Sequence, residues 1–313
     1  GMRDLEHALD KPEDSYRIAV IGDSYVTAQE VDLDESFFRQ LETILDSRGH
    51  NVEVLGFGVR GFGNDQEYRL LENYALKYDP DLVILAFVPN DVRNNRLELE
   101  GNPAKPYFEL SLDGTLVQRP FTPMPDHSDS WKSILYENLH VIRFVYFRAA
   151  QIPAIHNALV KFGVYANVLQ TPSGPDDLLI DTVYRAPPWP PEWEESWRIT
   201  ATLLREMKNM SNHSGAEFAL FSVTRAIQVD DMLFTELEEK HPILSLDHDN
   251  LDKRLAALAA SENIAFVPSL PAMRALQASG VPAHLQCDGH WSRDAHREAA
   301  ELLADHLISG GYL

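Results

Sequence analysis

A serine stands at the end of the first strand-like run of the chain. Gly22-Asp23-Ser24 directly follows the apolar, β-branched run at 16–21, and such a run breaking into glycine and a hydroxyl residue predicts a strand that ends in a tight turn. In an open α/β sheet, ligands bind beside the carboxyl ends of the strands. A serine in that place can act as a nucleophile if a base and an oxyanion site converge on it. The alternative is that Asp23 or Ser24 only caps the next helix.

A histidine near the far end of the chain could supply the base. Cys287-Asp288-Gly289-His290-Trp291-Ser292 precedes a helical apolar pattern that continues to Leu307. A histidine two residues after an aspartate, on the loop before the last helix, suits a general base held by an orienting carboxylate. Alternatively, His290 is a residue at a helix start with an acid nearby.

Two further turns follow strand-like runs between these ends. Gly61 lies in the glycine-rich stretch at 58–63, after the run at 52–55, and Asn90 follows the apolar run at 82–87. Either residue could serve only as a turn former. Their order along the chain, each after a predicted strand, is harder to explain as coincidence.

This ordered set resembles the SGNH hydrolases, the GDSL-type esterases and lipases. The resemblance implies that Ser24 is the nucleophile, His290 the base and Asp288 the orienting acid. The family usually has its acid three residues before the histidine, where this chain has Cys287.

The resemblance also implies an oxyanion hole, in which Gly61 lets the backbone approach the substrate closely. It is formed by the backbone amides of Ser24 and Gly61 and by the side-chain amide of Asn90, and Asp23 and Tyr25 lie beside the substrate. Val88 stands where the family commonly has glycine, two residues before Asn90.

The implied chemistry is ester cleavage. A serine hydroxyl is a poor nucleophile until a neighbouring imidazole takes its proton. We therefore expect a serine esterase that cleaves short acyl groups, such as acetyl, from a carbohydrate or other small molecule through an acyl-serine, with no cofactor. An O-acyltransferase, in which an alcohol replaces water, and a non-catalytic ligand-binding module with the same fold are the alternatives.

One competing motif is a dinucleotide-binding pattern. Gly56-Phe57-Gly58-Val59-Arg60-Gly61 satisfies G-x-G-x-x-G after a strand-like run. The acid that binds the ribose should end the next strand about 20 residues later. Asp79 and Asp81 precede that strand, and Asp91 comes too late, so the sequence disfavours a dinucleotide.

Metal hydrolysis is a second competitor. Asp247-His248-Asp249 and His284 are possible ligands, but no H-E-x-x-H or paired Cys/His spacing accompanies them. We expect no metal site, and Asp249 or Asn250 is expected to cap a helix. The α/β-hydrolase elbow G-x-S-x-G is absent from the sequence.

Composition narrows the partners. The chain has 313 residues, 44% of them hydrophobic, and a formal charge of −21 from 48 acidic and 27 basic residues. Such a charge disfavours nucleic acid and anionic membrane surfaces as partners. The partner that the resemblance implies is a small-molecule or glycan ester. Cys287 is the single cysteine, so no internal disulfide can form.

The sequence leaves localisation and oligomeric state open. It has neither a signal peptide nor an apolar run that could insert into a bilayer. Gly1 before Met2 indicates a residue left from cloning. If an upstream segment has been removed, we expect an exported or membrane-tethered protein. If none has been removed, we expect a cytoplasmic protein.

The remaining pattern gives the architecture. Residues 16–85 read as strand, helix, strand, helix, strand, with a helix after Ser24 that carries Phe37 and Phe38, and further strands are expected at 217–223 and 264–267. Together with the resemblance this predicts an α/β protein with a three-layer α/β/α, flavodoxin-like (SGNH) fold around a parallel sheet of about five strands.

Three segments are expected. Residues 1–15 form an N-terminal extension and 16–313 the hydrolase domain, with a large insertion after the third strand at about 95–195. The insertion should open with a hairpin at Asp113-Gly114 and continue with a helical pattern at 131–161 and a proline-rich loop at 171–191. We expect it to cap the site.

Overall fold

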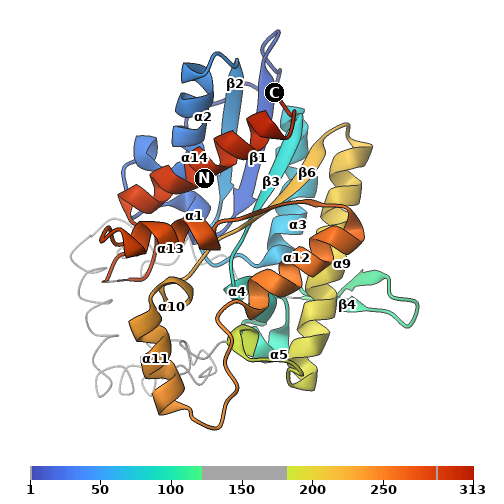
Figure 1. The fold of residues 1–313 in the computed structure, drawn as a ribbon. Coiled ribbons are helices and arrows are strands. Elements are labelled where there is room, and N and C mark those ends of the chain that lie inside the picture. Colours follow the sequence, from blue (N-terminus) through green and yellow to red (C-terminus); the bar gives the residue numbers. More distant parts are fainter. Residues whose placement is uncertain (1, 122–181, 287) are drawn as a thin grey trace, which may run out of the picture.

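The centre of the molecule is a parallel sheet of five strands. The computed structural model describes residues 2–121, 182–286 and 288–313. The strands lie in the order β2-β1-β3-β6-β7, which is the doubly wound, flavodoxin-like order (Figure 1). The predicted fold class is therefore confirmed. The strands are β1 (Tyr16–Gly22), β2 (Val52–Gly58), β3 (Leu82–Phe87), β6 (Glu217–Ser222) and β7 (Ala265–Pro268).

Helices cover both faces of this sheet (Figure 1). Ile18 and Val20 pack toward one helical layer, and Ala19 and Ile21 pack toward the other. Strands buried on both faces have continuous apolar runs, which is why these strands could be predicted. One layer holds α2 (Phe37–Ser47), α13 (Leu270–Ala278) and α14 (Arg293–Ser309), and the other holds α3 (Asn64–Asn73), α9 (Pro191–His213) and α12 (Asn250–Glu262).

Shorter helices follow the carboxyl ends of the strands. They are α1 (Ser24–Thr27), α4 (Asn90–Asn94), α5 (Leu97–Glu100), α10 (Ala226–Val229) and α11 (Asp231–Lys240). Three 3₁₀ turns lie elsewhere in the chain, at Leu33–Glu35, Ala75–Tyr78 and Thr182–Tyr184. None of the helices in the described ranges has the length and apolarity needed to cross a membrane.

The register of the sheet aligns the ends of three strands. Gly22 at the end of β1 pairs with Gly58 of β2 and with Ala86 of β3. The loops that follow these strands therefore start at the same edge of the sheet. These are the loops that carry Ser24, Gly61 and Asn90.

The predicted hairpin opens the segment after β3. Strands β4 (Phe108–Leu110) and β5 (Leu116–Gln118) are antiparallel, and Gly114 in their turn has φ +82°. The hairpin packs through Phe108 on α9. Residues 122–181 lie outside the described part, so the helical pattern at 131–161 and most of the proline-rich loop cannot be placed. The cap stays a prediction.

The expected helix after Ser24 that carries Phe37 and Phe38 is confirmed as α2. A separate short helix, α1, precedes it and ends at Thr27, where the C-cap residue Ala28 has φ 48°, so α2 starts only at Phe37. Arg3 from the N-terminal extension donates hydrogen bonds to the carbonyls of Thr27, Ala28 and Val31. Those carbonyls would otherwise accept bonds within a longer helix, so Arg3 stabilises the break.

The first two glycines of the G-x-G-x-x-G pattern are needed for packing. Both lie inside β2, and not in the turn that a pyrophosphate would require. A Cβ on Gly56 would come within 2.7 Å of the Phe38 ring, and one on Gly58 would lie 2.4 Å from the amide nitrogen of Thr27. Close contact of β2 with α1 and α2 therefore explains these residues.

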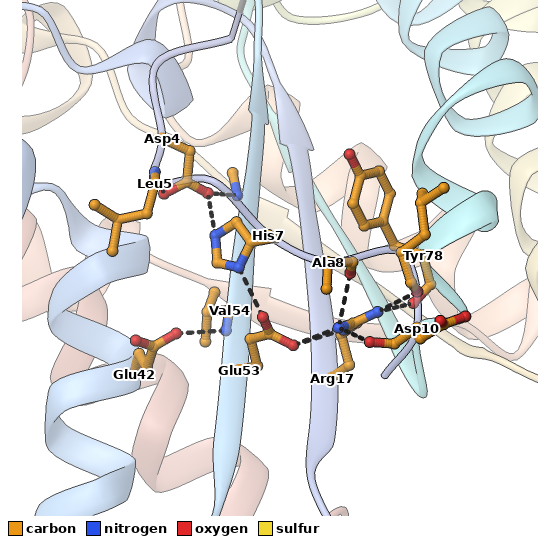
Figure 2. Close-up of polar contacts among 12 residues, drawn as sticks. Asp4, Leu5, His7, Ala8, Asp10, Arg17, Glu42, Glu53, Val54 and Tyr78 are labelled. Carbon is orange, nitrogen blue, oxygen red and sulfur yellow. Dashed lines mark hydrogen bonds and ion pairs between the residues drawn. The ribbon is translucent and has the colours of Figure 1, made fainter. Parts of the chain in front are cut away.

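A buried arginine fastens the N-terminal extension to the sheet. Figure 2 shows Arg17, fully buried near the start of β1, with the extension and the start of β2 around it. Its Nε donates to Glu53 Oε2 over 2.7 Å, and His7 in turn lies 2.7 Å from Glu53 Oε1. Hydrogen bonds to Asp4 and Glu53 raise the pKa of His7. The remaining Arg17 donors bind the carbonyls of Ala8, Leu9, Asp10 and Tyr78.

We predict that Arg17→Met strongly destabilises the protein. The substitution keeps most of the side-chain volume but leaves Glu53 Oε2 and the carbonyls without their arginine donor, and breaking such a buried pair costs about 3–5 kcal/mol. Urea denaturation measures it. Arg69→Met is the control, since the Arg69–Glu72 pair is on the surface and such pairs contribute about 0–1 kcal/mol. Equal losses in the two variants would contradict this role of Arg17.

Candidate active site

Ser24 and His290 meet at the carboxyl edge of the sheet. His290 Nε2 lies 2.8 Å from Ser24 Oγ, a hydrogen bond between residues 266 positions apart. Ser24 is the first residue of α1, directly after β1, where helix amides have no partner within the helix. His290 lies on the loop before α14.

The loop that carries His290 is fixed on both sides of the histidine. Leu285 donates its amide to the His290 carbonyl over 2.8 Å, and Gly289 donates to the Leu285 carbonyl over 2.9 Å. Gly289 has φ +79°, a conformation that favours glycine. The indole of the fully buried Trp291 donates to Thr224 Oγ1 over 3.1 Å. The imidazole therefore has a well-defined position.

Tyr25 lies against the imidazole. Its ring centre is 4.9 Å from that of His290, and its hydroxyl donates to the Gly289 carbonyl over 3.2 Å. Burial raises the pKa of Tyr25, so the hydroxyl remains a donor. The structure thus shows Tyr25 supporting the histidine loop as well as lining the cavity described below.

Two carboxylates surround the second nitrogen of His290. Nδ1 lies 3.6 Å from Asp288 Oδ2 and 3.7 Å from Glu30 Oε1, and it has no hydrogen-bond partner among the described residues. Asp288 also accepts the backbone amide of His290 on Oδ1 over 3.0 Å. Sequence reasoning missed Glu30, because it lies in the irregular segment between α1 and α2, where no periodic pattern singles it out.

Asp23 connects α1 to Asn90. Its Oδ1 accepts the Tyr25 amide over 3.0 Å, so it does cap α1, and its Oδ2 accepts Asn90 Nδ2 over 3.4 Å. Burial raises the pKa of Asp23. Asn90 begins α4 after β3, so Ser24 and Asn90 flank the point where the strand order reverses, at which ligands bind in such sheets.

Gly61 belongs to the same group. Its φ is +77°, and a Cβ there would meet no protein atom within 4 Å. The backbone conformation therefore favours glycine, and the expected close approach of a substrate to this backbone stays a prediction.

The seven site residues predicted from the sequence line one cavity of about 470 Å³. Arg93 and Arg225 are also part of its wall, and sequence reasoning did not single them out. The wall contains Asp23, Ser24, Tyr25, Gly61, Asn90, Asp288 and His290.

Buried acids lie beneath the Asn90 turn. Asn64 Nδ2 donates to Glu67 Oε2 over 2.8 Å and to Asp91 Oδ2 over 3.2 Å, and Asp91 Oδ2 also accepts the Val88 amide. Burial, together with neighbouring acids, raises the pKa of Glu67 to about 8 and that of Asp91 well above its usual value. Glu67 therefore keeps its proton near neutral pH, and the hydrogen bonds of Asp91 hold the turn between β3 and α4.

The other metal-ligand candidates do not join this site. Asp247 pairs with Lys253, and Asp249 is at the N-cap of α12 but bonds Arg274 instead of the helix. His284 Nε2 lies 3.0 Å from the Thr224 carbonyl, and burial lowers the pKa of His284 to about 4. Cys287 lies outside the described residues. In the described ranges, Glu30, Asp288 and His290 are the one group of ligand atoms close enough to share an ion.

We predict that Glu67→Gln stabilises the protein more at alkaline than at acid pH. Folded Glu67 keeps its proton up to about pH 8, whereas the unfolded carboxyl, with a pKa of 4.5, has already ionised. Its contribution to the free energy of unfolding is therefore complete below about pH 4.5 and is lost as pH rises toward 8.

Urea denaturation between about pH 5 and pH 8 tests this. The advantage of the variant over wild type should grow by at least about 1.4 kcal/mol, the equivalent of one pKa unit. Glu72→Gln, an exposed position on the same helix, should show no such trend. An advantage independent of pH would contradict the raised pKa.

Comparisons with known proteins find similar folds only. No protein-family model matches the sequence, and no curated protein matches it. Among solved structures, TesA is 14% identical with a TM-score of 0.47, covering 94% of this chain and 98% of its own. A catalytic mutant of Axe2, an acetylxylan esterase from Geobacillus stearothermophilus, is 12% identical with a TM-score of 0.48 (93% and 94% covered).

A putative lipolytic protein of the G-D-S-L family from Desulfitobacterium hafniense is 10% identical with a TM-score of 0.43, with 92% of this chain and 98% of that chain covered. The G-D-S-L family, which the Gly22-Asp23-Ser24 motif resembles, is thus represented among the structures to which this chain is similar.

Proposed function

We propose that the protein is a serine esterase of the SGNH type. Its substrates would be short-chain esters, such as acetyl esters, of a carbohydrate or other small molecule. The observation that carries this proposal is the 2.8 Å hydrogen bond between Ser24 Oγ and His290 Nε2, in a cavity that Gly61 and Asn90 also line. A nucleophile, a base and candidate oxyanion donors thus face one space.

In the acylation step, Ser24 Oγ attacks the carbonyl carbon of the ester while His290 Nε2 takes its proton. The tetrahedral intermediate then collapses. The C–O bond to the alcohol breaks, and the imidazolium returns the proton to the leaving oxygen. The products of this half-reaction are the free alcohol and an acyl group on Ser24.

Deacylation repeats these steps with water. His290 takes a proton from the water, which attacks the acyl carbon, and Ser24 leaves with that proton while the acid is released. If an alcohol attacks instead, the same site transfers the acyl group. The partition of product between acid and new ester, measured with an added alcohol, distinguishes hydrolase from acyltransferase.

Three donors would stabilise the oxyanion. They are the amides of Ser24 and Gly61 and the side chain of Asn90, which Asp23 orients. Loss of one such donor typically costs about 3–4 kcal/mol of transition-state stabilisation. Asp288 would orient His290 from the Nδ1 side.

The size of the cavity supports a small substrate. Sites for small molecules usually have volumes of about 300–1,000 Å³, and the wall formed by the described residues encloses about 470 Å³. A short acyl chain with its sugar or other small alcohol suits that space.

A fluorophosphonate probe tests the nucleophile. Wild type should be labelled and Ser24→Ala should not, because the probe reacts only with an activated serine. Ser47→Ala, at the exposed end of α2, should label like wild type. A folded wild-type protein that takes no label would contradict the esterase and favour a non-catalytic ligand-binding module.

Asn90→Ala tests the oxyanion hole. We expect kcat for p-nitrophenyl acetate to fall by about 10²–10³-fold with little change in KM, since the lost donor acts on the transition state. The exposed Asn73→Ala, at the end of α3, serves as the control. A change in KM with kcat retained would instead assign Asn90 to substrate binding.

A further inference from the structure

Among the residues that the structure describes, none forms a hydrogen bond with the second nitrogen of the proposed base. A catalytic histidine needs an acceptor at Nδ1, which fixes the tautomer and stabilises the imidazolium. The two candidate oxygens lie at 3.6 Å on Asp288 and 3.7 Å on Glu30, and both distances exceed that of a hydrogen bond. Such contacts are often long without substrate and tighten when it binds.

The two carboxylates differ in burial. The Asp288 side chain is 39% exposed, whereas that of Glu30 is 9% exposed. Water screens an exposed charge far more than a buried one, so at similar distances the buried carboxylate acts more strongly on the imidazolium. Asp288 is moreover engaged with the His290 backbone amide.

We propose that Glu30 is a positioning residue for His290, which shares the orienting role with Asp288. This inference rests on the proposed function, since it concerns the same histidine. Glu30 does not touch the substrate. It acts through the imidazole, holding Nδ1–H and offsetting the positive charge that forms during proton transfer.

A second contact fixes the Glu30 side chain. Arg60 Nη1 donates to Glu30 Oε1 over 2.6 Å, and this is the same oxygen that faces His290. Arg60 directly precedes Gly61, so the ion pair connects the base to the loop of the oxyanion hole. The arginine also limits the rotamers that Glu30 can adopt.

The backbone around Glu30 is held from the N-terminal extension. Arg3 donates to the Thr27 carbonyl over 3.1 Å and to the Val31 carbonyl over 2.7 Å, on either side of Glu30. Both the side chain and the backbone of Glu30 are therefore restrained.

Glu30→Gln tests the proposal, because it keeps the shape and removes the charge. We expect kcat to fall by about 10–100-fold, as for other partners of an active histidine, with little change in KM. The midpoint of the acid limb of the kcat/KM profile should move to lower pH, because the imidazolium loses a neighbouring anion. Glu35→Gln, in the same segment but paired with Arg293, is the matched control.

A second readout does not depend on turnover. The NMR titration of the His290 imidazole, assigned by its loss in His290→Gln, should move to lower pH in Glu30→Gln and remain near wild type in Glu35→Gln. Glu30→Asp, which retains the charge, should recover part of the shift. If Glu30→Gln fails to fold, Glu30→Asp is compared with Glu30→Ala, which lacks the carboxylate, and the His290 titration in Glu30→Asp should lie at the higher pH of the two.

The outcomes separate the two proposals. An active wild type with an unchanged profile and titration in Glu30→Gln would overturn the role of Glu30 alone. A wild type that neither hydrolyses esters nor takes up the fluorophosphonate would overturn the esterase, while a shifted titration in Glu30→Gln would still place Glu30 as the partner of His290.

Discussion

The site depends on the register of three neighbouring strands. Because Gly22 pairs with both Gly58 and Ala86, the chain leaves β1, β2 and β3 at one edge of the sheet. Parallel strands can be aligned in this way only when crossover helices return the chain to the opposite edge each time. Ser24, Gly61 and Asn90 therefore reach one cavity, and the last loop before α14 brings His290 to it.

Charge is arranged in two ways around this edge. Beneath the Asn90 turn, burial raises the pKa of Glu67 to about 8 and also raises the pKa of Asp91, which reduces the negative charge behind the cavity in a chain with a formal charge of −21. Beside His290, Asp288 and Glu30 lie close to the imidazole, where negative charge is useful. The N-terminal extension contacts two parts of the molecule. Arg3 binds a carbonyl of the loop that carries Glu30, and Arg17 of β1 binds a backbone carbonyl of the extension itself.

Much of the fold could be predicted because its signals are local. The strands are buried on both faces and read as apolar runs, and Asp113-Gly114 marks a turn by its chemistry. The break between α1 and α2 has no such local signal, because it depends on hydrogen bonds from Arg3, which is distant in sequence. The glycines at 56 and 58 matched a nucleotide-binding pattern by coincidence. Glycine is required there because a Cβ would collide with Phe38 or with α1.

The sequence by itself determined the residue types and their order: a hydroxyl after the first strand, an amide after the third and an imidazole before the last helix. It could do so because strand ends and turns depend on neighbouring residues. Only the tertiary structure decided that Ser24 and His290 lie 2.8 Å apart and that Glu30 approaches the same imidazole. Those distances depend on strand pairing and helix packing between residues far apart in the chain, for which a single sequence has no local signal.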